Sequence, residues 1–202
     1  MATIPADVVK RLRDSTGAGM MDCKKALEES GGDMDKAVEY LRKKGAATAA
    51  KRADRMTNQG LVEAYIHAGG RIASMVELNC ETDFVAKTPE FKALAHDLAM
   101  QIAAMNPRYV TKEQVEKDVI DKELEIYTTQ AQNEGKPANI AQKVAQGRLE
   151  KFYQEVCLME QSFIKDSGKT IRDLIDEATA KVGEKVSIRR FIRYHLGENN
   201  AS

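Results

Sequence analysis

Residues 61–80 read LVEAYIHAGGRIASMVELNC. Apolar and polar side chains alternate on both sides of a glycine pair, Gly69 and Gly70, and the alternation is regular from Ile72 onward. A period of two is typical of strands with one buried face, and a short glycine-rich loop joins neighbouring antiparallel strands. The stretch therefore predicts a β-hairpin with its loop over residues 68–71.

Helical spacing follows the hairpin. From Pro89 to Met105, apolar side chains recur at helical intervals, a stripe that needs a sheet or other helices to cover it. Residues 112–133 and 140–159 are also helical in pattern, but they carry many charges and a thinner apolar face. We expect those two segments to form an antiparallel pair.

The end of the chain returns to strand character. After a predicted helix over residues 171–182, residues 185–196 read KVSIRRFIRYHL, where apolar side chains alternate again, interrupted by Arg190. This pattern predicts a third strand that joins the hairpin. The side chains expected to share one of its faces are Val186, Ile188, Ile192, Tyr194 and Leu196.

Before the hairpin, three short helical patterns cover residues 6–14, 20–29 and 34–44. Glycine-containing turns separate them, Asp33 is placed to cap the third, and Gly45 lies just past its end. Isolated helices shorter than roughly 12–15 residues are marginal in water. The three are therefore expected to pack on one another as a bundle.

Together these patterns predict an α+β chain with three parts. A three-helix module covers residues 1–45, a linker covers 46–59, and a core over 60–202 layers helices on a three-stranded antiparallel sheet. The linker region, GAATAAKRADRMTNQG at residues 45–60, accumulates Ala, Lys and Arg without a regular apolar stripe. It fits either a solvated helix or a flexible tether.

Composition limits the function classes. Among 202 residues, 31 Lys and Arg balance 31 Asp and Glu, so no net charge draws the chain to nucleic acid or to an anionic membrane. No apolar run reaches the roughly 20 residues that span a bilayer. Cys23, Cys80 and Cys157 lie far apart without metal-ligand spacing, which indicates reduced thiols. We expect a cytoplasmic protein that binds neither membranes nor nucleic acid directly.

Motifs for covalent chemistry or for cofactors are missing from the sequence. It has no GxxxxGK[ST] or GxGxxG loop for phosphates and no GxSxG elbow for a nucleophile. No histidine has a second one at metal-ligand spacing, so His67, His96 and His195 are expected in surface or packing roles. These absences argue against an enzyme and against a cofactor.

Basic residues cluster in the linker and at three arginines near the end of the sequence. Arg189, Arg190 and Arg193 have the charge to hold phosphates. The balanced overall charge and the absence of interleaved aromatic residues favour a solvated strand instead.

The segment LRDSTGAGMMDCKKAL, residues 12–27, is unusual. It places Met20 and Met21 directly after a glycine turn, where a polar start to the helix is ordinary. One interpretation is that one methionine fills the bundle core and the other is exposed by chance. The other is that these polarisable side chains form a protein-binding patch, with Lys10 and Arg13 supplying charged contacts nearby.

A second unusual segment, ELNCETDFVAKTPEF at residues 77–91, runs from the second strand to the next helix. Thr82, Asp83, Phe84 and Val85 therefore occupy a connection, where an aromatic side chain beside a carboxylate is informative. A loop phenylalanine is often tucked beneath its own domain, and Thr82 or Asp83 can cap a short turn. Binding to a partner is the alternative.

Taken together, LRDSTGAGMMDCKKAL and ELNCETDFVAK resemble the two signatures of the elongation factor Ts family. The resemblance continues through GRLEKFYQEVCLMEQSFIKD and VGEKVSIRRFIRYHLG, residues 147–166 and 182–197, so it covers nearly the whole chain. The length is similar to that of the short members, which have a single core repeat. The resemblance implies an N-terminal module like those that bind ubiquitin, followed by an antiparallel-sheet core.

In function, the resemblance implies nucleotide exchange without covalent chemistry. Such a protein binds GDP-bound elongation factor Tu, disturbs its Mg²⁺ and phosphate site, and promotes GDP release. The resemblance also suggests a homodimer, since two copies could rebuild the surface for which longer members use two core repeats.

The resemblance also assigns roles to individual residues. Asp83 and Phe84, between Thr82 and Val85, would be the tip that enters between helices of the nucleotide domain of elongation factor Tu. A second set would hold another face of that domain. Its members are Lys10, Arg13, Met20 and Met21.

Two further positions carry different expectations. Val182 and Gly183 match an apolar–glycine pair that, in the family, presses near the phosphate-binding loop. Longer members carry a histidine in the helix before the Pro-containing loop, whereas this chain has Gln101. The helper role of that position is therefore in doubt here.

Two other function classes remain open. A general interaction module would use its N-terminal helices to bind other targets, including ribosomal components. An enzyme would turn over a substrate with no GTPase present. Retained binding to the partner after deletion of residues 1–45 would distinguish the exchange factor from the interaction module, since the tip around Phe84 would remain.

Overall fold

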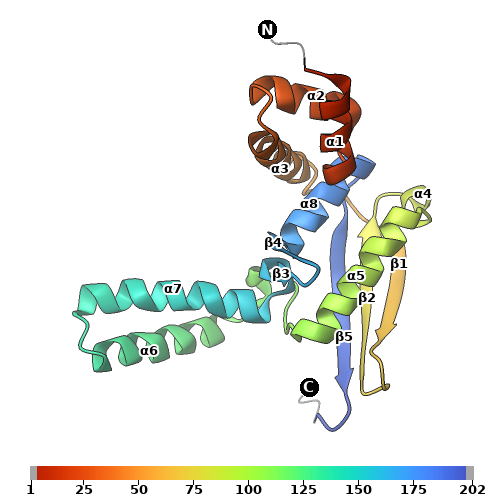
Figure 1. Ribbon diagram of the computed structural model, residues 1–202. Coiled ribbons are helices and arrows are strands. Elements are labelled where there is room, and N and C mark those ends of the chain that lie inside the picture. The colour runs from red at the N-terminus through yellow and green to blue at the C-terminus, as the bar shows by residue number, and fades with distance from the viewer. Residues whose placement is uncertain (1–3, 199–202) are drawn as a thin grey trace. The chain divides into compact units, whose positions relative to one another are not determined.

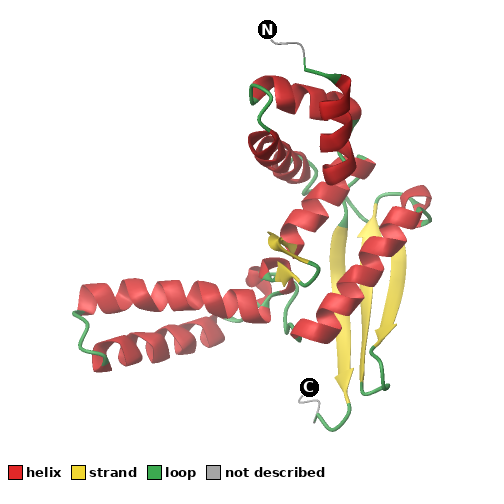
Figure 2. Cartoon of the chain, viewed as in Figure 1, coloured by secondary structure: helices red, strands yellow, loops and turns green. Residues whose placement is uncertain are grey.

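The computed structural model describes residues 4–198 and confirms the α+β fold class (Figures 1 and 2). Its residues group into two compact units. The first holds the chain up to Leu61 together with residues 78–94 and 172–187, and the second holds 62–77, 95–171 and the chain from Ile188. Every residue that the sequence analysis predicted to bind the partner lies in the first unit.

The first unit begins with the predicted bundle of three helices. They are α1 (Ala6–Thr16), α2 (Met20–Glu29) and α3 (Met34–Ala50). As predicted, Asp33 caps the third helix, because its carboxylate accepts a hydrogen bond of 3.1 Å from the backbone N–H of Lys36. The core of the bundle consists of Val9, Leu12, Cys23, Ala26, Leu27 and Ala37.

The predicted end of the third helix at Gly45 is wrong, because α3 continues to Ala50. Gly45 is buried and lies close to Asp176 of α8 (Ile171–Val182). Arg42 of α3 also donates two hydrogen bonds to the carboxylate of Asp173. Packing against α8 and the alanine-rich continuation outweigh the helix-breaking tendency of one glycine. The division at residues 45 and 59 stays a prediction.

The predicted three-stranded sheet is present, with β1 (Gln59–Ile66), β2 (Ile72–Cys80) and β5 (Ser187–His195) in the order β1-β2-β5. The predicted hairpin loop is confirmed by a hydrogen bond of 2.9 Å from the N–H of His67 to the carbonyl oxygen of Ile72. Directly after β2 come α4 (Asp83–Ala86) and the predicted helix α5 (Pro89–Met105).

Helix α5 contacts one face of all three strands. The Tyr65 ring packs edge-on against His96 of α5, with ring centroids 5.7 Å apart. The hydroxyl of Ser74 donates to the carbonyl of Ala99 over 2.6 Å. In β5, Arg193 Nε donates to the carbonyl of Ala103 over 3.0 Å. These contacts identify which residues of each strand face the helix.

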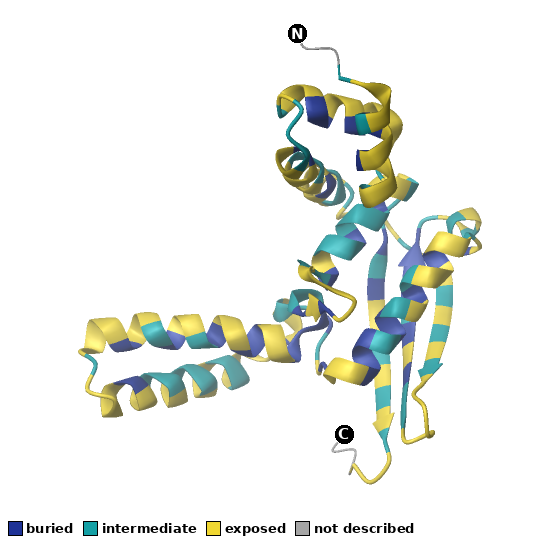
Figure 3. Ribbon diagram, in the orientation of Figure 1, coloured by how far each residue is buried: buried dark blue, intermediate teal, exposed yellow. Residues whose placement is uncertain are grey.

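The predicted single face of the last strand is wrong. Val186 and Ile188 are buried, whereas Ile192 and Tyr194 are exposed. The alternation changes phase at two consecutive exposed arginines, which both form ion pairs with Glu77. The burial colours of Figure 3 show the alternation along the strands.

The second unit also holds the predicted antiparallel helix pair, α6 (Lys117–Asn133) and α7 (Ala138–Val156) (Figure 1). The first helix does not begin at Lys112. Instead, a short 3₁₀ turn, η1 (Lys112–Gln114), is closed by a capping box between Thr111 and Gln114. A second 3₁₀ turn, η2 (Leu158–Glu160), follows α7.

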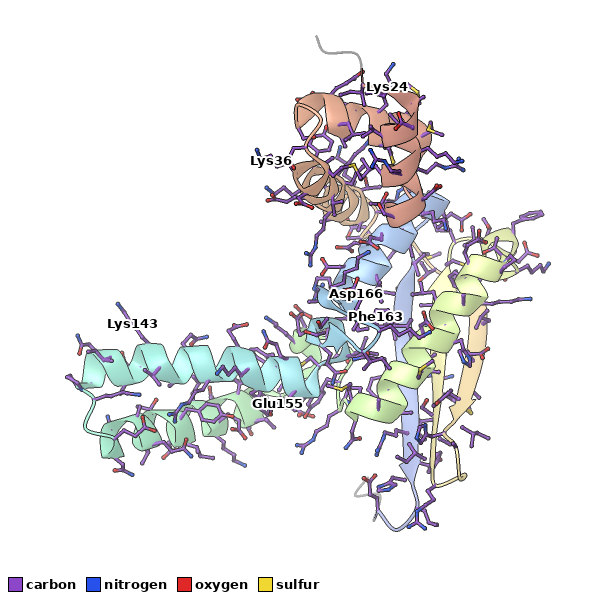
Figure 4. All side chains as sticks on the ribbon, viewed as in Figure 1. Lys24, Lys36, Lys143, Glu155, Phe163 and Asp166 are labelled. Carbon is purple, nitrogen blue, oxygen red and sulfur yellow. The ribbon has the colours of Figure 1, made fainter. Side chains whose placement is uncertain are left out.

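A small hairpin before α8 was not predicted from the sequence. Strands β3 (Ser162–Phe163) and β4 (Asp166–Thr170) pair antiparallel, with Phe163 opposite Asp166. Figure 4 labels both of these side chains. The strands are too short for a period of two to be visible in the sequence.

All three cysteines are free and buried. Burial raises the pKa of the Cys157 thiol to about 11, and it also raises the pKa values of Cys23 and Cys80. A raised thiol pKa disfavours the reactive thiolate, so these side chains behave as small core residues.

Candidate functional site

The side chain of Phe84 projects from a very short helix. Helix α4 follows β2 after two residues, and Phe84 is 79% exposed although its neighbours Cys80 and Ala86 are buried. The interpretation that Phe84 is tucked beneath its own domain is therefore wrong. A large aromatic side chain held in solvent is available for contact with another molecule.

An ion pair and hydrogen bonds hold α4 and its short connection to α5. The carboxylate of Asp83 pairs with Lys87 at 2.6 Å, and this bond is the main reason that the pKa of Asp83 lies below its usual value. Thr88 donates its hydroxyl to the carbonyl of Val85 over 2.8 Å and accepts from the N–H of Phe91 over 3.3 Å. Phe84 therefore stands on a segment with a defined backbone.

The upstream end of α4 is held by a residue far away in sequence. Glu184 accepts two hydrogen bonds from Thr82, one of 3.0 Å from its backbone N–H and one of 2.7 Å from its hydroxyl. Cys80 donates from its thiol to the carbonyl of Thr82 over 3.1 Å. Thr82 does not cap α4 with its own side chain.

Glu81, the residue before Thr82, binds in turn to the segment that contains Glu184. Its carboxylate accepts a hydrogen bond of 2.6 Å from the backbone N–H of Lys185, and this bond is the main cause of its lowered pKa. Arg55 contributes a second contact at 3.2 Å. The structure therefore brings residues 81–84 next to residues 183–185, two segments that the sequence analysis had singled out separately.

The loop after α8 carries the second predicted pair. Gly183 has a positive φ of 72°, and its carbonyl accepts a hydrogen bond from Arg52. Val182 lines a cavity of about 200 Å³ together with Thr16 of α1 and Phe91 of α5. This cavity joins the end of the N-terminal module to the Val182–Gly183 segment.

The N-terminal set of candidates is exposed. Met20 and Met21 are 45% and 73% exposed, and Lys10 and Arg13 lie on the surface of α1. The interpretation that one methionine fills the bundle core is wrong, because smaller side chains fill it. Adjacent exposed methionines form an adaptable apolar surface of the kind that proteins use to bind others.

Gln101 belongs to the second unit and is fully buried. Its amide nitrogen donates to Gln161 Oε1 and to the carbonyl of Ser162 over 3.2 and 3.1 Å. Its amide oxygen accepts from the N–H of Ile164 over 2.9 Å. Every contact of Gln101 therefore serves to anchor the β3 region, a structural role.

The other polar candidates are paired with neighbours. The three histidines each have a ring nitrogen within about 3.1 Å of Tyr65, Glu63 or Glu198.

In the part of the chain from residue 4 to 198, no group of three or more His, Cys, Asp or Glu side chains is placed to hold a metal ion. Over the same residues, no helix combines the length and apolar character needed to cross a membrane.

Sequence reasoning missed Glu81, Glu184 and Arg52, which connect the predicted segments. Glu81 and Glu184 lie within the stretches ELNCETDFVAK and VGEKVSIRRFIRYHLG, and Arg52 lies in the predicted linker, but nothing in these stretches marks an ordinary charged residue as a connection between segments. Only the pairing of segments about a hundred residues apart reveals their position.

Comparison with known proteins places the chain in a family. It matches the family described as Elongation factor TS over residues 6–198. It is 62% identical to Elongation factor Ts of Desulforamulus reducens over 98% of this chain and 91% of that protein. Identity to Elongation factor Ts of Moorella thermoacetica is also 62%, over 96% of each chain. With a match over nearly its full length, this chain belongs to the elongation factor Ts family.

Proposed function

We propose that this chain is a guanine-nucleotide exchange factor that acts during translation elongation in the cytoplasm. It binds GDP-bound elongation factor Tu, disturbs the Mg²⁺ and phosphate site of that protein, and promotes GDP release. The observation that carries the proposal is the exposed aromatic side chain of Phe84 on a firmly held helix. Membership of the elongation factor Ts family supports the choice of partner.

The mechanism needs no catalytic group. GTPases hold GDP through a backbone cradle around the phosphates and through an octahedral Mg²⁺ that retains waters, so a small displacement of either weakens binding. Phe84 acts as an apolar wedge between helices of the nucleotide domain, with Asp83 as its polar companion. Val182 and Gly183 press near the phosphate-binding loop.

The N-terminal module supplies a second contact. Lys10, Arg13, Met20 and Met21 are all exposed, and we propose that they hold another face of the same domain. Residues 1–45 are then the partner-binding module, and residues 60–202 form the core that carries the wedge.

The required free energy is modest. A thousandfold faster release corresponds to about 4 kcal/mol in the dissociation barrier. A few buried contacts around an aromatic anchor supply energies of this size. Linkage makes the effect reciprocal, so GDP weakens binding of the factor by the ratio at which the factor weakens GDP binding.

Release of a fluorescent GDP analogue from purified elongation factor Tu tests the proposal. Saturating amounts of this protein should accelerate release by about a thousandfold, the factor that corresponds to about 4 kcal/mol. No acceleration, despite binding to elongation factor Tu, would refute exchange and favour the general interaction module.

We also propose that the chain is a homodimer. Tyr65, Ser74 and Arg193 face α5, so the alternate residues of the three strands face away from that helix. That opposite surface, here called the open sheet face, carries a group of exposed apolar side chains. It comprises Val62, Ile66, Met75, Ile192 and Tyr194. A second copy of the chain covers such a face with an identical one.

Ile192→Asp is expected to convert the dimer into a monomer, because it places a charge where two open sheet faces would meet. Light scattering at micromolar concentration should report half the wild-type mass. The matched control is Ile126→Asp on α6, where a similarly exposed isoleucine lies outside the sheet. A monomeric wild type, or an Ile192→Asp dimer, would contradict the homodimer.

A further inference from the structure

The two segments of the candidate site are joined by a reciprocal pair of acidic residues. Glu184 accepts hydrogen bonds from the backbone N–H and the hydroxyl of Thr82. Glu81 accepts a hydrogen bond from the backbone N–H of Lys185. Each glutamate thus binds the residue that follows the other glutamate in sequence. We call this arrangement the Glu81–Glu184 lock.

The lock satisfies backbone groups that no secondary structure satisfies. Thr82 precedes α4 in an extended conformation, and its own hydroxyl points to Glu184 instead of capping the helix. Lys185 lies between α8 and β5, outside both elements. Charge-assisted hydrogen bonds from such N–H groups are stronger than neutral ones, so each glutamate restrains the backbone of the opposite segment.

A third segment braces the lock. Arg55 lies 3.2 Å from the carboxylate of Glu81, and Arg52 donates to the carbonyl of Gly183. Lys185 Nζ donates to the carbonyls of Ala53 and Arg55. The segment predicted as a linker is therefore bonded to both sides of the lock in the first unit.

We propose that Glu81 and Glu184 are positioning residues that make the Phe84 wedge and the Val182–Gly183 loop a single rigid element. The inference rests on the proposed function, because it explains how two separate contacts move the nucleotide site together. If Phe84 stood on a mobile segment, its side chain would still bind between the helices of the nucleotide domain. The segment would then move instead of displacing those helices.

The lock is testable without any partner. The chain has no tryptophan, so Phe84→Trp creates a single fluorescent reporter on α4. Adding Glu184→Gln replaces one acceptor oxygen with an NH₂ group that cannot accept from Thr82. We expect faster local motion of the reporter, seen as lower fluorescence anisotropy. Unchanged anisotropy would overturn the lock.

A matched control separates the lock from general charge effects. Glu150→Gln removes a carboxylate from an exposed ion pair with Lys112 in the second unit and should leave the anisotropy of the reporter unchanged. Thr82→Val keeps the N–H bond to Glu184 but loses the hydroxyl bond, so its effect should be smaller than that of Glu184→Gln. Equal melting temperatures show that each variant is folded.

Exchange kinetics test the role in function. With Phe84 in place, Glu184→Gln should lower the saturating rate of GDP release by about tenfold and change the half-saturating concentration by less than about twofold. In a Phe84→Ala background the same change should have a smaller effect, since only the contact of the Val182–Gly183 loop remains to be positioned. An unchanged saturating rate would overturn the positioning role.

The two proposals fail in different ways. If the wild type does not accelerate GDP release, the proposed function is wrong, and the anisotropy of the reporter still decides whether the lock exists. If the wild type is active and Glu184→Gln is equally active at saturation, the exchange function stands and the lock has no part in it.

Discussion

Phe84→Ala should reduce the acceleration of GDP release at saturation by about 100-fold, with little change in stability. Truncating an aromatic hot spot at an interface costs about 2–4 kcal/mol, and about 2.7 kcal/mol corresponds to 100-fold. The side chain is 79% exposed in the free protein, so its removal leaves no cavity. Surface substitutions of this kind change the melting temperature by about 2 °C or less.

The measurement is stopped-flow release of the fluorescent GDP analogue over a range of factor concentrations, beside thermal unfolding of each variant. Phe84→Leu keeps part of the apolar surface and should fall between wild type and alanine. Ile126→Ala is the control, because it removes an exposed apolar side chain from α6 in the second unit. Wild-type exchange by a normally melting Phe84→Ala protein would exclude the wedge.

The parts of the fold that depend on local patterns could be predicted from the sequence. Helix α2 has the predicted bounds, and the hairpin lies on either side of the predicted glycine loop. These elements are specified by a period of apolar residues and by turn residues at their ends, both of which act over a few positions. Asp33 is an example, since its capping bond spans only three residues.

The errors lie where tertiary contacts override a local signal. Gly45 has the character of a helix end, yet it lies within α3 because α8 packs against it. Ile192 appeared to continue the face of Ile188, yet the phase of β5 changes between them. In both cases the deciding neighbour is more than a hundred positions away or on another strand, where periodicity carries no information.

Some residues of the candidate site could likewise be predicted from the sequence, and others could not. Phe84 and Met21 stand out in the sequence by their positions, Phe84 in a connection and Met21 just after a glycine turn, and both are exposed. Glu81 and Glu184 do not stand out, because glutamates in a polar stretch are common. Their significance comes from the hydrogen bonds they exchange across 104 and 102 positions, which only the folded chain brings into range.

Gly60→Ala should lower the free energy of unfolding by about 3 kcal/mol, which is large for a single methyl group. A Cβ atom at Gly60 would lie 2.2 Å from the carbonyl oxygen of Leu78 and 2.8 Å from Cα of Asn79. Both are backbone atoms of β2, so no side-chain rotation relieves the clash. The φ of Gly60, 151°, is also one that other residues rarely adopt.

Urea unfolding at a fixed protein concentration measures this effect, with Gly147→Ala as the matched control. Gly147 lies in α7, and apart from the backbone of its own helix nothing lies within 4 Å of its Cβ position, so the same methyl group should stabilise the helix by about 0.5–1 kcal/mol. Equal urea midpoints for Gly60→Ala and wild type would contradict this prediction. They would show that β1 shifts against β2 to make room for the methyl group. Because Leu78 and Asn79 lead directly into Glu81 and Thr82, a strand end that shifts would also displace the Glu81–Glu184 lock. The close packing of Gly60 against β2 therefore holds in place the segment that carries Phe84.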